Sequence, residues 1–128
     1  MSSPASFEGR RIVICDYNAL LLSVTGLLRM SGYCVFQAHD GLAARELCQE
    51  LPDIELLVLN TTGTGTDTPT LVRDVRAKCP GLAVLHIGVS APEGLPDDVP
   101  TLAETFTADE LLEAVGTLLL PGLLVGHN

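Results

Sequence analysis

Short apolar runs alternate along this chain with segments in which leucine, valine and alanine recur at helical spacing. Each run is too short for a helix and has no polar alternation, which is typical of a strand that is buried on both faces. The predicted strands cover residues 10–16, 34–38, 54–59, 82–88 and 101–103. The segments of helical spacing between and after them predict helices over 20–28, 41–51, 69–78 and 108–119.

Capping residues predict where three of these helices begin. Asp40 precedes the second helix and can accept a hydrogen bond from its first turn. Thr68 followed by Pro69 supplies an N-cap and a first-turn proline for the third helix. Thr107 and Glu110 have the spacing of a capping box, in which each side chain bonds the backbone of the other, at the start of the last helix.

The connection between the fourth and fifth strands differs from the others. Residues 90–100 contain Pro92, Pro96 and Pro100 as well as Gly94. Proline removes a backbone donor and clashes with the preceding helical turn, so we expect the fourth helix to be missing or reduced to a turn.

Strands that alternate with helices require right-handed crossovers and a parallel sheet covered on both faces. The prediction is therefore an α/β fold with a doubly wound, five-stranded parallel sheet. One domain over residues 10–119 accounts for the pattern, with a flexible arm at 1–9 and an apolar tail at 120–128. The tail is expected to pack on the last helix, mediate self-association or lead into a longer protein.

Ligands of such sheets bind beyond the carboxyl ends of the strands. The residues at those ends are the candidates for function. They are Cys15 and Asp16 after the first strand, Asn60 after the third, Gly88 after the fourth and Glu104 after the fifth.

Five segments in this order give the chain a family resemblance. They are RIVICDYNALL, SGYCVFQAHDG, PDIELLVLN, LVRDVRA and TLAETF. Together they resemble the receiver domain of two-component response regulators, the CheY-like module of phosphorelay signal transduction. The resemblance covers about residues 10–119 and implies a flavodoxin-like fold.

The resemblance also implies which residues would hold a phosphoryl group, and most of them are replaced here. In the family, two acids after the first strand hold Mg²⁺, and an aspartate after the third strand accepts the phosphoryl group. Cys15–Asp16 and Asn60 stand at these positions. A Thr or Ser after the fourth strand and a Lys after the fifth contact the phosphate, where this chain has Gly88 and Glu104.

These replacements all remove groups that phosphorylation of a receiver domain requires. The amide of Asn60 is not a competent nucleophile for phosphorus. Mg²⁺ prefers anionic oxygen ligands, so its binding should be weak or lost when Asp16 is the one remaining acid and Cys15 offers a soft sulfur. Glu104 would repel a phosphate. We expect a degenerate receiver, not an enzyme and without a cofactor, that acts as a phosphorylation-independent protein-interaction module.

Charge restricts the partners. The chain has a net charge of −9, with 16 acids against 7 bases and no basic run. Phosphate backbones and anionic lipids are bound by Lys and Arg, so neither nucleic acid nor a membrane surface is an expected partner. The expected partner is therefore another signalling protein, or a second copy of this chain in a homodimer.

The cysteines predict the compartment. Cys15, Cys34, Cys48 and Cys79 are widely spaced, which favours buried free thiols in a reducing cytoplasm over disulfides. No apolar run approaches the ~20 residues that a membrane-spanning helix requires.

Two other functions stay open. The altered strand-end pocket could sense a small molecule or a metal ion, with Asp16 either a vestigial ligand or a helix cap. Cys15 could act as a nucleophile, although no neighbouring cation in the sequence would activate it. His86 lies within a predicted strand and is interpreted as a packed residue and not as a ligand.

Overall fold

The computed structural model describes residues 10–15, 19–60 and 68–119. The predicted arm at 1–9, the apolar tail at 120–128 and Asp16 lie outside the described residues. The strands are β1 (Arg11–Cys15), β2 (Cys34–Ala38), β3 (Ile54–Asn60), β4 (Ala83–Ile87) and β5 (Thr101–Leu102). The helices are α1 (Ala19–Met30), α2 (Gly41–Glu50), α3 (Thr68–Lys78) and α4 (Ala108–Leu119).

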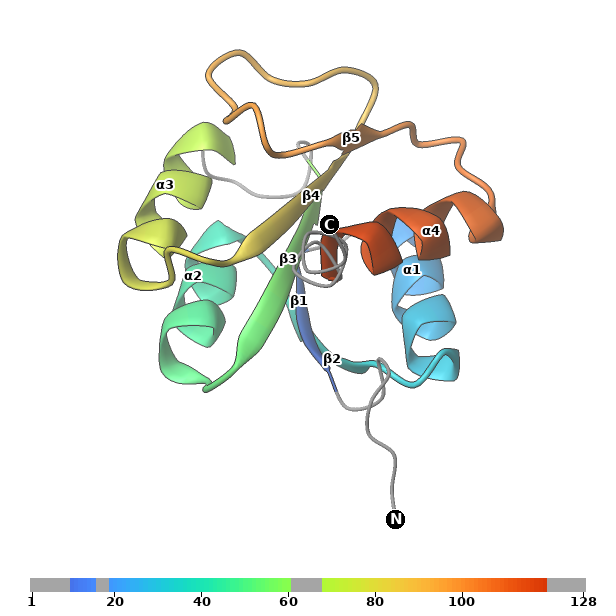
Figure 1. Ribbon diagram of the computed structural model, residues 1–128, viewed down its shortest axis with the longest axis horizontal. Coiled ribbons are helices and arrows are strands. Elements are labelled where there is room, and N and C mark those ends of the chain that lie inside the picture. The colour runs from blue at the N-terminus through green and yellow to red at the C-terminus, as the bar shows by residue number, and fades with distance from the viewer. Residues whose placement is uncertain (1–9, 16–18, 61–67, 120–128) are drawn as a thin grey trace, which may run out of the picture.

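The five strands form one parallel sheet in the order β2-β1-β3-β4-β5. Helices α1 and α4 cover one face of the sheet, and α2 and α3 cover the other (Figure 1). The predicted doubly wound, flavodoxin-like α/β fold is therefore confirmed.

Each face of the sheet has its own aliphatic core. Side chains alternate along a strand, so Ile12 and Ile14 of β1 join the cluster beneath α1 and α4, whereas Val13 joins the one beneath α2 and α3. All three side chains are completely buried. Burial of both faces explains why the strands appear in the sequence as continuous apolar runs.

Two of the three predicted helix starts are confirmed. The Oδ1 atom of Asp40 accepts the Ala43 N–H at 2.9 Å. Thr107 and Glu110 form the capping box, because the Thr107 N–H donates to Glu110 Oε1 at 2.9 Å and the Glu110 N–H donates to Thr107 Oγ1 at 3.1 Å. The N-cap role of Thr68 is wrong: this residue is the first of α3, and its buried hydroxyl has no hydrogen-bond partner among the described residues.

No helix occurs between β4 and β5, where every residue is described, and this confirms the prediction from the prolines. The prolines act as acceptors, because the Leu95 N–H donates to Pro92 O at 3.3 Å and the Val99 N–H to Pro96 O at 3.1 Å. Both donors also pack on the core beneath α2 and α3. The loop therefore covers part of the sheet face that a helix would otherwise cover.

One arginine ties this loop to α3. Arg76 makes a bidentate pair with Asp98, with N–O distances of 3.0 and 2.9 Å, and its Nε donates to Leu82 O at 3.0 Å. The hydrogen bonds with Arg76 lower the pKa of the Asp98 carboxyl. The side chain of Arg76 is 19% exposed, so its hydrogen bonds are partly shielded from water.

The cysteines are all free, but they are not all buried. Cys15 and Cys48 are buried, Cys79 is intermediate and Cys34 is exposed. The predicted burial of Cys34 is wrong because this residue begins β2, which forms an edge of the sheet. Burial, together with the nearby Cys79 and Cys15 thiols, raises the pKa of Cys48 to about 12, which keeps this thiol protonated and unreactive.

His86 is a polar residue in the middle of this apolar sheet. It is completely buried on β4, and its Nδ1 lies 3.1 Å from the hydroxyl oxygen of Thr101, its register partner on β5. Burial lowers the pKa of the imidazole, and the carboxylate of Glu104 opposes this effect in part. His86 is a packed residue, as predicted, and it supports the pairing of the two strands.

The described helices include none that is both long and apolar enough to cross a bilayer.

The first prediction concerns the hydrogen bonds through which Arg76 holds the loop between β4 and β5. We expect Arg76→Met to lower the free energy of unfolding by about 1–2 kcal/mol, because it removes charge-assisted hydrogen bonds to Asp98 and Leu82. Amide exchange of residues 92–99 should accelerate. Arg73→Met on the same helix is the control, since Arg73 is 75% exposed and lies 3.7 Å from its nearest carboxylate. Equal losses of unfolding free energy for the two variants, measured in urea, would contradict this role of Arg76.

The second prediction concerns the stability of the folded protein at acidic pH. Because burial lowers the folded-state pKa of His86 below that of the unfolded chain, the unfolded state binds a proton first as the pH falls. Stability should therefore decline below about pH 6.5, by at most about 1.4 kcal/mol per pH unit. Urea midpoints between pH 7.5 and 5 measure this slope. His86→Gln should flatten it and the exposed-residue control His39→Gln should not; an unchanged slope in both variants would refute the assignment.

Candidate functional site

The carboxyl ends of four neighbouring strands bring the candidate residues to one edge of the sheet. Cys15 ends β1, Asn60 ends β3, Gly88 follows β4 and Glu104 follows β5. The parallel register places Cys15 beside Leu59 and Asn60 beside Ile87, so these ends are level with one another. Asp16 follows Cys15 directly but is not among the described residues.

The side chains of Asn60 and Glu104 meet at this edge. Asn60 Nδ2 donates to Glu104 Oε2 at 3.2 Å, across 44 residues of sequence. Asn60 is 1% exposed, whereas Glu104 lies at the surface. A neutral amide beside a carboxylate gives an attractive contact, while a second carboxylate at this distance would repel the first. Asn60 is therefore compatible with Glu104 in a way that an aspartate at position 60 would not be.

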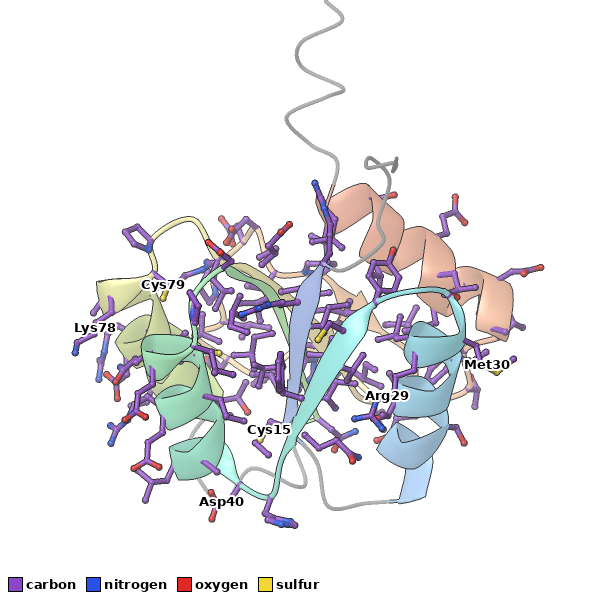
Figure 2. The ribbon with its side chains drawn as sticks, turned by 90° about the horizontal axis from the view of Figure 1, so that it is seen from below. Cys15, Arg29, Met30, Asp40, Lys78 and Cys79 are labelled. Atoms are coloured by element: carbon purple, nitrogen blue, oxygen red, sulfur yellow. The ribbon has the colours of Figure 1, made fainter. Side chains whose placement is uncertain are left out.

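Cys15 faces the apolar interior. Its side chain is completely buried in the cluster beneath α2 and α3, with Ala38 and Leu59. Figure 2 shows Cys15 at the end of β1, on the side of the molecule where Asp40 begins α2. A thiol in such surroundings contributes to packing, and these surroundings favour neither a thiolate nucleophile nor a ligand for a hard cation.

Gly88 contributes only backbone to the edge. Its N–H donates to Leu102 O at 3.0 Å, which helps to hold β5 against β4. With no side chain, this position can neither bond a phosphate through a hydroxyl nor move toward one.

The described part of the edge therefore has little means of holding an anion. Its one charged side chain among the candidates is Glu104, and the nearby imidazole of His86 is kept neutral by burial, which lowers its pKa. Among the described residues, no three His, Cys, Asp or Glu side chains gather as metal ligands would. The Asn60–Glu104 hydrogen bond is a direct contact between β3 and the segment after β5.

Two contacts outside the candidate residues were not predicted from the sequence. The His86–Thr101 pair depends on the register of β4 and β5, which a two-residue strand does not reveal in advance. The Arg76–Asp98 pair joins residues 22 positions apart, and the one available signal was the presence of opposite charges on α3 and in the loop.

Comparison with known proteins was made by sequence and by structure. Neither the family models nor the curated proteins contain a match to the sequence. Solved structures do match. The receiver domain of the hybrid histidine kinase CckA is 30% identical, with a TM-score of 0.71 over 85% of this chain and 98% of that chain.

Two further structures extend the comparison. A response regulator receiver protein from Sinorhizobium medicae is 26% identical, with a TM-score of 0.75 over 89% of this chain and 97% of that one. The receiver domain of a sensor histidine kinase from Pseudomonas aeruginosa, solved with a magnesium ion in its active-site cleft, is 20% identical, with a TM-score of 0.72 over 87% and 98% of the two chains.

The shared fold, the near-complete coverage of the CckA domain and the 30% identity lead to one assignment. This chain belongs to the receiver-domain family of two-component signalling proteins.

Proposed function

We propose that this protein is a degenerate receiver domain that works as a protein-interaction module without being phosphorylated. The observation that carries the proposal is the hydrogen bond between Asn60 and Glu104. An acyl phosphate requires a carboxylate oxygen as the nucleophile, and the amide of Asn60 does not supply one. The neighbouring Glu104 places negative charge where a phosphoryl group would have to bind.

The other replaced positions support the same proposal. Cys15 is buried among apolar side chains, and Gly88 offers only a backbone N–H that already bonds Leu102. Mg²⁺ needs several oxygen ligands, and Asn60 and Cys15 do not replace the missing carboxylates. We therefore propose that neither catalysis nor a bound cofactor is part of the function. Sensing of a ligand at this edge stays a prediction, because Asp16 lies outside the described residues.

The contact between Asn60 and Glu104 can be tested by measuring the free energy of unfolding. We expect Asn60→Asp alone to lower the free energy of unfolding by about 1–3 kcal/mol at pH 7, because it places two carboxylates in contact. The repulsion raises the folded-state pKa of the pair, so the loss should shrink as the pH falls toward 4. Adding Glu104→Lys should restore stability. Urea unfolding of the three proteins measures this, and a stable single variant with no gain from the second would argue against the contact.

Phosphoryl analogues test the proposal directly. The protein is titrated with beryllofluoride and Mg²⁺, and separately with acetyl phosphate and Mg²⁺, while amide resonances are followed. We expect no saturable change around Asn60. The beryllofluoride-activated NtrC4 receiver domain is the positive control for the reagent. Saturable shifts confined to the carboxyl ends of β1, β3 and β4 would overturn the proposal.

A further inference from the structure

Three of the four cysteines gather on one face of the sheet. Cys15 and Cys48 are buried in the core cluster beneath α2 and α3, and Cys79 packs against the same cluster while it stays partly exposed. Cys34 is exposed and belongs to neither core cluster. Figure 2 shows Cys79 at the end of α3, away from Cys15 at the end of β1. The three thiols thus share one core but differ in their access to solvent.

A proline leaves room for Cys79 at the end of α2. The carbonyl groups in the last turn of a helix have no partners within the helix. The Leu51 N–H donates to Leu47 O, but the next position that could donate to Cys48 O is Pro52, which has no N–H. The thiol of Cys79 donates to Cys48 O instead, with an Sγ–O distance of 3.4 Å. The Cys79 sulfur is therefore held against the residue that carries a second thiol.

The two thiols differ in what can reach them. Cys48 is 1% exposed, whereas Cys79 is partly exposed and follows the exposed Lys78. Burial, together with the nearby thiols of Cys79 and Cys15, raises the pKa of Cys48 to about 12. The thiolate is the form that attacks a disulfide, so Cys48 does not react first with an oxidant in solution. Access to solvent makes Cys79 the point of entry.

We propose that Cys79 and Cys48 form a reversible disulfide, with a small-molecule disulfide such as oxidised glutathione as the oxidant. The Cys79 thiolate attacks one sulfur of the oxidant, whose S–S bond breaks and releases one thiol. The Cys48 thiolate then attacks the Cys79 sulfur and displaces the second thiol. The protein loses two electrons and two protons, which leave with the two small thiols. This inference goes beyond the proposed function and does not depend on it.

The second step is hindered by burial but favoured by proximity. With a pKa of about 12, roughly one Cys48 thiol in ten thousand is ionised at pH 8. A thiolate of high pKa is a strong nucleophile, and well-oriented groups in one molecule reach effective concentrations of about 10⁵ M. Because the ionised fraction sets the rate, closure of the disulfide should accelerate about tenfold per pH unit between pH 7 and 9.

Other roles for these cysteines fit the structure less well. Cys15 and Cys48 are both buried, so a disulfide between them would require an oxidant inside the core. Cys34 lies outside that core, and its oxidation would give mixed or intermolecular disulfides. Within the described residues, the sulfurs do not gather as metal ligands would. The simplest alternative is that the Cys79 thiol only donates to Cys48 O, and it predicts no disulfide.

The experiment uses the full chain with Cys34→Ser, which removes the exposed thiol. The protein is equilibrated at pH 8 with mixtures of reduced and oxidised glutathione, quenched with acid, unfolded and alkylated with N-ethylmaleimide. Mass spectrometry then identifies each cysteine. We expect a monomer that has lost two hydrogen atoms, in which Cys15 is alkylated and a single disulfide joins Cys48 to Cys79. Dithiothreitol should reverse the change.

Matched variants, each lacking one thiol, separate the two steps. Cys79→Ser should form neither the disulfide nor a stable adduct with glutathione. Cys48→Ala should stop at the first step and accumulate the mixed disulfide on Cys79. Cys15→Ala is the control and should still form the disulfide. Urea unfolding confirms that each variant is folded, and the pH dependence of closure in the Cys34→Ser protein tests Cys48 without a core substitution.

The disulfide should also change stability. Cys48 and Cys79 are 31 positions apart, and a bond between them restricts the unfolded chain. We expect a higher urea midpoint for the oxidised than for the reduced Cys34→Ser protein, and equal midpoints for the Cys79→Ser variant under the two conditions.

Four results would rule the pairing out. They are the absence of an intramolecular disulfide at every glutathione ratio, a disulfide that maps to Cys15, a closure rate that does not change with pH, and a mixed disulfide on Cys79 that persists although Cys48 is present. The first and the last would leave Cys79 as a hydrogen-bond donor alone. None of these measurements involves a phosphoryl analogue or a partner protein, so they do not decide the proposed function.

Discussion

The parallel pairing of β1 and β4 on either side of β3 is the constraint on which the rest of the structure depends. Leu56 to Asn60 of β3 are all buried, so this strand is held on both faces and on both edges. Because the strands are parallel, their carboxyl ends must meet at one edge, whatever residues stand there. The fold therefore fixes where the candidate site lies, independently of the side chains that stand there.

The contact between Asn60 and Glu104 pairs a buried amide with a carboxylate at the surface. The amide of Asn60 donates a hydrogen bond to Glu104, whereas a carboxylate at position 60 would repel it. This hydrogen bond joins β3 to the segment after β5. Substitutions at these two positions should therefore influence each other's effect on stability.

Much of the fold follows from local pattern. The strands and helices were predicted within one or two residues, since doubly buried strands give apolar runs and the capping box between Thr107 and Glu110 is a local signal. Thr68 and Cys34 were misjudged because their surroundings depend on how α3 meets the sheet and on β2 being an edge. The site residues were predicted as positions, whereas the Asn60–Glu104 contact and the His86–Thr101 pair depend on side-chain geometry that no spacing reveals.

The prolines between β4 and β5 have a consequence for the unfolded chain. Pro92 and Pro96 each accept a hydrogen bond through their carbonyl groups, and so does Pro100 from the His86 N–H at 3.0 Å. None of these contacts uses the donor that proline lacks. Because the pyrrolidine ring also fixes φ before folding begins, each proline reduces the conformational entropy that the loop loses on folding. The residues that forbid a helix here thus help a segment without regular structure to stay ordered.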